Sequence, residues 1–184
     1  MELVAELVTV AVLTAIVLAW ADRSKLDLGL HRRPALIAAW PWAALYAAWI
    51  AAEWHLLGVY PVDVDPEFLE WIEQLSLIEE IALTVLVWPL FEELLLRGAM
   101  FSALLRRWGL WAAVVVPSLI WGLMHLQYEG WLLASIAGTG VVLAMARWKS
   151  GSLYVPLALH AGSNFVDLLA ARGLFGEAAA AAGY

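Results

Sequence analysis

Six polar side chains in an otherwise apolar part of the chain could carry out hydrolysis: Glu92, Glu93, Arg97, His125, His160 and Asn164. Glu93 and Arg97 are four residues apart, so they share a helical face and can form an ion pair. Glu92 is turned by about 100° from Glu93 and is expected to face a different neighbour. A carboxylate in a dry cavity can take a proton from water, while a histidine and an amide on one face can donate to an oxyanion. The pattern predicts a water-activating carboxylate beside an oxyanion site.

The composition indicates which elements position these groups. The chain has 184 residues, 64% of them hydrophobic and 15% charged, with a mean hydropathy of +0.82. Soluble domains are roughly half apolar, and a membrane crossing needs about 20 apolar residues. We therefore predict an all-α, polytopic membrane helical bundle that forms a single integral membrane domain over residues 1–184. Charged groups inside a bilayer are costly unless they face a protein interior or a water-filled cavity, so the polar side chains are expected to share a cavity.

The hydrophobic pattern predicts about six transmembrane helices and one further helix. An acidic segment, Gly58 to Glu80, is expected to contain an amphipathic helix that covers the outer face of the bundle. The first apolar run is interpreted as a retained span and not a signal peptide, because acidic Glu2 and Glu6 stand where a basic region would be. The tail after Ala171 is expected to be poorly ordered. The predicted spans are Leu3–Trp20, Ala35–Leu57, Ile81–Leu105, Leu110–Leu126, Trp131–Ala146 and Ser152–Ala171.

Basic residues alternate between the predicted connectors. The second and fourth connectors contain none, and basic residues in short loops mark the cytoplasmic side. This distribution predicts that the odd-numbered connectors are cytoplasmic and that both termini lie outside. Eight of the ten basic residues fall in the odd-numbered connectors: Arg23, Lys25, Arg32, Arg33, Arg106, Arg107, Arg147 and Lys149.

The residue inventory narrows the chemistry. The chain has no cysteine, which excludes a thiol nucleophile and thiolate metal sites. A serine nucleophile is also disfavoured, because Ser163 points about 100° away from Asn164 on a helix. Glu92, His125 and His160 would make a plausible catalytic zinc set. Metal-free water activation is favoured over that alternative, because no H-E-x-x-H pair is present and Arg97 would oppose a nearby cation.

Three ordered motifs carry a resemblance to a known family. EELLLRG at 92–98, WGLMH at 121–125 and HAGSN at 160–164 resemble the EExxxR, FxxxH and HxxxN motifs of the CAAX protease and bacteriocin-processing family of intramembrane endopeptidases, also called the Abi family. The resemblance covers about residues 88–170, which we expect to form the catalytic core. The sequence departs from the pattern at Trp121, where the family usually has Phe.

The resemblance implies an intramembrane endopeptidase that cleaves near a substrate's C-terminus or beside its membrane segment. Carried over to this sequence, Glu92 would activate the water with help from His125, His160 and Asn164 would hold the oxyanion, and Glu93 with Arg97 would orient the catalytic carboxylate. This assignment requires Glu92 to converge with both histidines.

The resemblance also bears on partners and location. The expected partners are a peptide or protein substrate in or at the membrane and the lipid bilayer, with no nucleic acid and no cofactor, zinc remaining the alternative. The chain fits a prokaryotic inner membrane, where peptide or bacteriocin-leader processing is favoured over cleavage of a prenylated tail. Two other functions remain open. One is a catalytically silent scaffold or immunity-type protein of the same family. The other, a proton-coupled transporter, is disfavoured because no inverted repeat is detectable.

Overall fold

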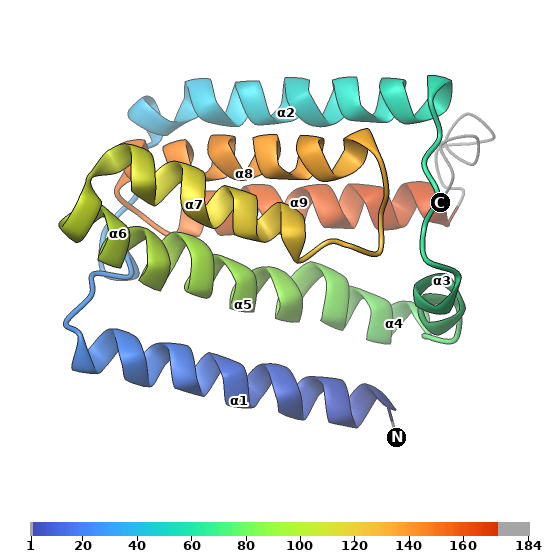
Figure 1. Cartoon of the computed structure of the whole chain (residues 1–184), viewed down its shortest axis with the longest axis horizontal. Helices are drawn as coiled ribbons and strands as arrows, with labels where there is room; N and C mark the ends of the chain where they lie inside the picture. Colours follow the sequence, from blue (N-terminus) through green and yellow to red (C-terminus); the bar gives the residue numbers. More distant parts are fainter. Residues whose placement is uncertain (1, 173–184) are drawn as a thin grey trace.

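A computed structural model describes residues 2–172, and over this range the protein is an all-α membrane bundle (Figure 1). Six long helical stretches lie side by side, in agreement with the predicted number of spans. The predicted tail lies outside the described residues from residue 173 on. The stretches are α1 (Glu2–Arg23), α2 (Leu36–Val59), a continuous run from α4 to α6 (77–108), α7 (Leu110–Leu123), α8 (Trp131–Ser150) and α9 (Tyr154–Ala171).

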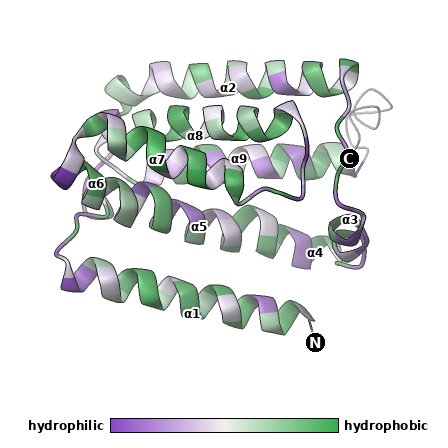
Figure 2. Ribbon diagram, in the orientation of Figure 1, coloured by the Kyte–Doolittle hydropathy of each residue, from purple (hydrophilic) through white to green (hydrophobic). Residues whose placement is uncertain are grey.

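Several of these helices suit a bilayer by length and composition. Leu3–Arg23, Leu36–Val59 and Trp131–Ser150 are each long and apolar enough to cross a membrane, and Leu110–Leu123 is a shorter apolar helix. In α1 and α2 only 11% of the most apolar window is buried inside the protein. Many hydrophobic side chains of both helices are exposed, so they suit contact with lipid. Figure 2 shows that hydrophobic residues recur along the length of α1 and α2.

The third crossing is a helix whose turns change width. It begins with α4 (Leu77–Glu80) and continues through a π-helical segment η1 (Ile81–Val87), α5 (Trp88–Glu93), a second π-helical segment η2 (Leu94–Met100) and α6 (Phe101–Trp108). The N–H of Trp88 bonds the carbonyl of Leu83, and the N–H of Phe101 bonds that of Leu96, five residues back in each case. Such wide turns occur frequently at functional sites. Here they stand on both sides of the short segment that carries Glu92 and Glu93.

The predicted amphipathic helix is α3 (Pro66–Glu73), which lies across one end of the bundle (Figure 1). The Asp65 side chain caps its first turn, where Pro66 stands at a position that needs no N–H donor. The apolar face of α3 points into the bundle. Phe68 packs edge-on against Tyr128, and Trp71 stacks on Trp88 with ring centroids 5.6 Å apart.

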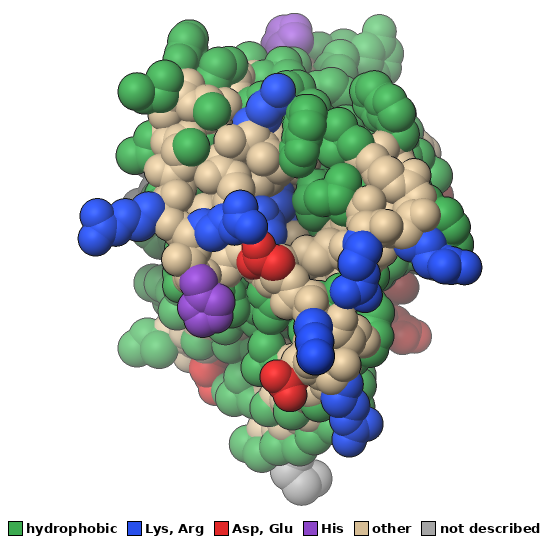
Figure 3. Space-filling view, turned by 90° about the vertical axis from the view of Figure 1, so that its left-hand side faces the viewer, with side chains coloured by type: hydrophobic (Ala, Val, Ile, Leu, Met, Phe, Trp, Pro, Cys, Tyr) green, Lys and Arg blue, Asp and Glu red, His purple; other side chains and the backbone are tan. Residues whose placement is uncertain are grey.

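Basic side chains gather at the opposite end, which Figure 3 shows face-on. The last turns of α1, α6 and α8 contribute Arg23, Arg106, Arg107, Arg147 and Lys149 to this end. The two ends of the bundle thus differ in charge, as the alternation of connectors predicts.

Small residues allow α7 and α8 to pack closely, as the composition of the fifth span predicts. A Cβ added at Gly122 would lie 3.1 Å from both the Cβ of Ala137 and the carbonyl oxygen of Leu133. Gly140 is similarly confined, because an added Cβ would lie 3.0 Å from the Cα of Ser118 and 3.1 Å from Nη2 of Arg97. This close packing brings Arg97 to the backbone of α8.

Candidate active site

One imidazole lies between the two carboxylates of α5. Nδ1 of His160 is 3.0 Å from Oε1 of Glu93, and its Nε2 is 3.8 Å from Oε2 of Glu92. Because the carboxylate of Glu93 accepts hydrogen bonds, Nδ1 of His160 carries a proton and is the donor in this bond. Glu92 and Glu93 bond different neighbours, as predicted, because Oε2 of Glu92 accepts from the indole of Trp121 whereas Oε1 of Glu93 accepts from Arg97 and His160. Both carboxylates nevertheless approach the same imidazole, each at a different ring nitrogen.

The predicted ion pair between Glu93 and Arg97 is confirmed. Nη1 of Arg97 donates to Oε1 of Glu93 at 2.8 Å, and both side chains are completely buried. Nη2 of Arg97 donates to the carbonyl oxygen of Gly140 on α8 at 3.3 Å. This pair is therefore sealed from the cavity, and it connects the third crossing to α8.

His125 lies just beyond the end of α7. The predicted fourth span extends to Leu126, but the helix ends at Leu123. The N–H of Met124 still bonds the carbonyl of Ile120, four residues back, whereas the N–H of His125 bonds that of Gly122, three residues back, in a tighter turn. Nδ1 of His125 lies 2.8 Å from the carbonyl oxygen of Trp121. A carbonyl can only accept, so Nδ1 is protonated, and Nε2 of the neutral ring is an acceptor. The His125 ring stacks on the ring of Tyr128, with ring centroids 6.3 Å apart.

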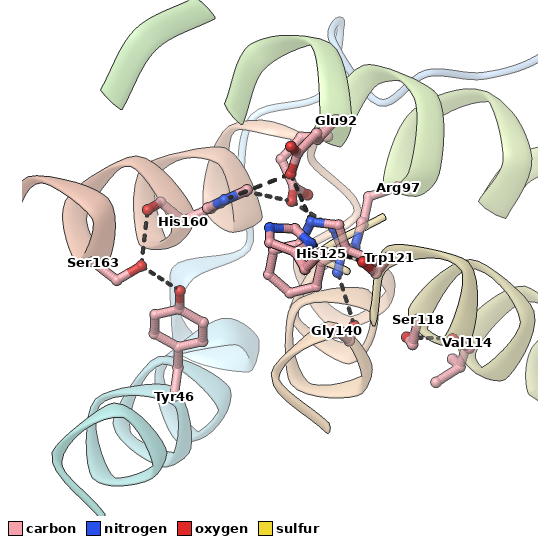
Figure 4. A network of polar contacts seen from close by, with 11 residues as sticks. Tyr46, Glu92, Arg97, Val114, Ser118, Trp121, His125, Gly140, His160 and Ser163 are labelled. Atoms are coloured by element: carbon pink, nitrogen blue, oxygen red, sulfur yellow. Dashed lines mark hydrogen bonds and ion pairs between the residues drawn. The ribbon is translucent and has the colours of Figure 1, made fainter. Parts of the chain in front are cut away.

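A cavity of about 840 Å³ joins these groups. It extends from α1 and α3 at one side to α8, and α2 and α9 contribute to its wall. Figure 4 shows that the side chains of Glu92 and His160 approach each other, with Trp121 and His125 beside them. Four of the predicted residues line the cavity, namely Glu92, His125, His160 and Asn164, whereas the buried Glu93 and Arg97 support it from behind.

Asn164 makes a contact that the sequence does not predict. Its amide nitrogen donates to the carbonyl oxygen of Thr84 at 2.8 Å, within the π-helical segment η1. Widened turns in a membrane helix leave backbone groups that other side chains must satisfy. Asn164 thus serves the shape of the third crossing, and the second N–H of its amide remains for another acceptor.

Helix α2 forms one wall of the site, although it carries none of the three motifs. The hydroxyl of Tyr46 lies 2.7 Å from Oγ of Ser163, which itself donates to the carbonyl oxygen of His160 at 2.9 Å (Figure 4). The tyrosine is therefore the donor in its bond to Ser163, because the serine has one proton to give. The indole of Trp54 donates to Asp167 at 2.8 Å, a second link between α2 and α9. Helical spacing could have identified the cavity face of α2, but not its partners.

The zinc alternative can be compared with the geometry of the described residues. Within residues 2–172, no three His, Cys, Asp or Glu side chains are grouped so that they could hold a metal ion. Glu92, His125 and His160 share the cavity without forming such a group. Oε2 of Glu92 instead accepts the indole N–H of Trp121 at 2.6 Å, a contact that the sequence did not suggest.

The chain is similar to known proteins over part of its length. An uncharacterised 24.3 kDa protein of Escherichia coli is 36% identical over 84 residues, which are 44% of this chain, and the chain spans 39% of that relative's length. No solved structure matches. A family match covers residues 74–166 and includes all three motifs. The chain therefore belongs to the family described as type II CAAX prenyl endopeptidase, Rce1-like.

Proposed function

We propose that this protein is an intramembrane endopeptidase that hydrolyses peptide bonds with a water activated by Glu92. The observation that carries the proposal is the approach of Glu92 to His160, with Oε2 and Nε2 3.8 Å apart at one cavity wall that His125 also lines. That distance exceeds a direct hydrogen bond, and a water or a substrate oxygen can take part between polar groups at such separations.

The first step is attack by water on the scissile carbonyl carbon. Glu92 takes a proton from the water as the new C–O bond forms, and Nε2 of His125, the acceptor of the neutral ring, holds the water in line. The carbonyl oxygen becomes an oxyanion. When the C–N bond breaks, the proton held by Glu92 passes to the leaving nitrogen, so the carboxylate is restored and the products are a carboxylic acid and an amine.

The oxyanion is assigned to His160 and Asn164. The imidazolium form of His160 donates from Nδ1 to Glu93 and from Nε2 into the cavity, and Asn164 offers the amide N–H that Thr84 does not use. Loss of one such donor lowers kcat by about 10²- to 10³-fold in enzymes where it has been measured. The buried pair of Glu93 and Arg97 would hold the His160 ring in place.

No metal is part of this proposal. The guanidinium of Arg97 is 4.5 Å from the centroid of the Trp121 ring that contacts Glu92, so a fixed positive charge already lies close to the carboxylate.

The proposed substrate is a peptide or the membrane-proximal segment of a protein, and the proposed location is a prokaryotic inner membrane with both termini outside. The cavity supports this class of substrate, because its wall combines apolar side chains of α1 and α8, such as Leu13 and Ile136, with the polar groups that act on the peptide bond.

The test is cleavage of a proteome-derived peptide library by the full chain in liposomes, with products identified by mass spectrometry. We expect wild-type protein to generate new peptide termini and Glu92→Gln to abolish them. Glu70→Gln, which removes an exposed carboxylate on α3, is the matched control and should cleave like the wild type. Equal cleavage by Glu92→Gln would refute the mechanism. Absence of any cleavage by the wild type would favour the catalytically silent member of the family.

A further inference from the structure

The indole of Trp121 lies at the centre of the candidate active site. Its side chain is buried, and its Nε1 is 2.6 Å from Oε2 of Glu92. The guanidinium of Arg97 lies 4.5 Å from the ring centroid, and the rings of His125 and His160 meet it edge-on at 5.3 and 5.0 Å. One ring thus contacts residues from all three motifs.

In the hydrogen bond between Trp121 and Glu92, the chemistry of the two groups decides which one donates. An indole N–H can only donate, and a buried indole needs an acceptor. Because the acceptor is a carboxylate, the bond belongs to the stronger, charge-assisted class. It fixes one oxygen of Glu92, which restricts rotation of the carboxylate and leaves Oε1 for the water. A side chain without this donor, such as Phe, would leave the carboxylate of Glu92 free to turn.

The backbone of Trp121 orients a second group. Its carbonyl oxygen receives the proton of His125 Nδ1 at 2.8 Å, which turns Nε2 of that ring toward other partners. Trp121 therefore contacts Glu92 through its side chain and His125 through its main chain. The two contacts act on the two groups that would handle the water.

We propose that Trp121 is a positioning residue whose indole N–H holds the Glu92 carboxylate in its reactive orientation. This inference rests on the proposed function for its kinetic consequence, whereas the bond itself can be measured independently. A purely structural indole would make the same contacts with Arg97, His125 and His160, but its N–H would have no specific effect on turnover.

The kinetic test uses the peptide that wild-type protein cleaves fastest. Trp121→Phe keeps an aromatic ring and removes the N–H, and 3-benzothienylalanine at the same position keeps the shape of indole with sulfur in place of N–H. We expect both to lower kcat by about 10- to 100-fold, the effect of losing one hydrogen bond to a charged group, with KM changed by less than about threefold. Trp131→Phe is the matched control, because it removes an indole donor, to the carbonyl oxygen of Tyr60, at a position that does not line the cavity. Its kcat should remain that of the wild type.

The bond is measured in protein labelled with ¹⁵N-tryptophan in detergent micelles. The indole N–H resonance of Trp121 is assigned by its disappearance in Trp121→Phe. Glu92→Gln replaces a charged acceptor with a neutral one, so this proton resonance should move upfield while that of Trp54 stays in place. This readout does not depend on turnover, so it separates a failure of the inference from a failure of the proposed function.

Three results would overturn the inference. An indole resonance of Trp121 that does not respond to Glu92→Gln means that the bond is absent. Wild-type kcat in the benzothienylalanine protein means that the N–H is dispensable, even where Trp121→Phe is misfolded or inactive. A raised KM at unchanged kcat means that the ring acts in substrate binding and not on the carboxylate.

Discussion

Nδ1 of His160 lies 3.0 Å from Oε1 of Glu93, although 67 residues separate them in the chain. The same oxygen accepts a hydrogen bond from Nη1 of Arg97 at 2.8 Å. Glu93 therefore connects the guanidinium of Arg97, on the same crossing, to the imidazole of His160 on α9. Because its side chain is completely buried, this carboxylate serves the position of His160 and stays out of contact with the cavity.

Removal of the Glu93 charge should destabilise the protein. In Glu93→Gln, Arg97 becomes a buried cation without a charged partner, and breaking a buried pair in this way costs about 3–5 kcal/mol. We expect a clear fall in the unfolding temperature, measured in detergent by the fluorescence of the 12 tryptophans. Glu70→Gln, on an exposed surface, should unfold like the wild type. An unchanged unfolding temperature for Glu93→Gln would mean that the pair contributes little.

Replacement of both partners separates stability from function. Glu93→Leu combined with Arg97→Met leaves no unpaired charge, and such exchanges of buried pairs for apolar residues are often neutral or stabilising. We expect the double variant to recover most of the unfolding temperature that Glu93→Gln loses. Peptide cleavage should stay low, because His160 no longer has an acceptor for Nδ1. Recovery of cleavage together with stability would show that the pair has no role in positioning His160.

Local spacing predicted some of these relationships and missed others. The pair of Glu93 and Arg97 was predictable because residues four apart on one helix meet whatever the rest of the fold does. The bond from Trp121 to Glu92 was not, because it depends on how two helices pack and which edge of the indole faces the carboxylate. The sequence marked Trp121 only as a departure from the Phe that the family usually has at this position.

The π-helical turns of the third crossing could not be predicted from the sequence either. The π-helical segments contain ordinary apolar residues such as Leu83 and Leu96, and no residue type marks such turns. They are compatible with the bilayer because other side chains satisfy the backbone, as Asn164 does for Thr84. The link between Tyr46 and Ser163 was hidden for the same reason, since each belongs to a different helix outside any shared spacing.

Gly140 should tolerate no side chain. A Cβ at this position would lie 3.0 Å from the Cα of Ser118, which is backbone and cannot turn aside. We expect Gly140→Ala to cost about 1–3 kcal/mol by overpacking, seen as a lower unfolding temperature. Gly162→Ala is the matched control, because an added Cβ there meets no atom within 4 Å and alanine gains about 1 kcal/mol of helix propensity. A stable Gly140→Ala protein would contradict the close packing of α7 and α8.

The proposed mechanism predicts that cleavage does not depend on a bound metal. The purified protein should cleave the library peptide equally well before and after treatment with 1,10-phenanthroline, since Glu92 would act on water directly. Elemental analysis should find no stoichiometric zinc, and the His125→Ala protein should have the same metal content as the wild type. Stoichiometric zinc that is lost in His125→Ala would contradict the metal-free proposal and support the Glu92, His125 and His160 set.

The charge difference between the two ends of the bundle predicts its orientation in a bacterial membrane. The chain has no cysteine, so Ser24→Cys, beside the basic end of α1, and Glu129→Cys, in the exposed turn before α8, each provide a single thiol. If basic connectors stay in the cytoplasm, an impermeant maleimide applied to spheroplasts should label position 129 and leave position 24 unlabelled until the membrane is lysed. The cysteine-free parent measures background labelling. The reverse pattern would place α3, and the part of the cavity that it lines, on the cytoplasmic side.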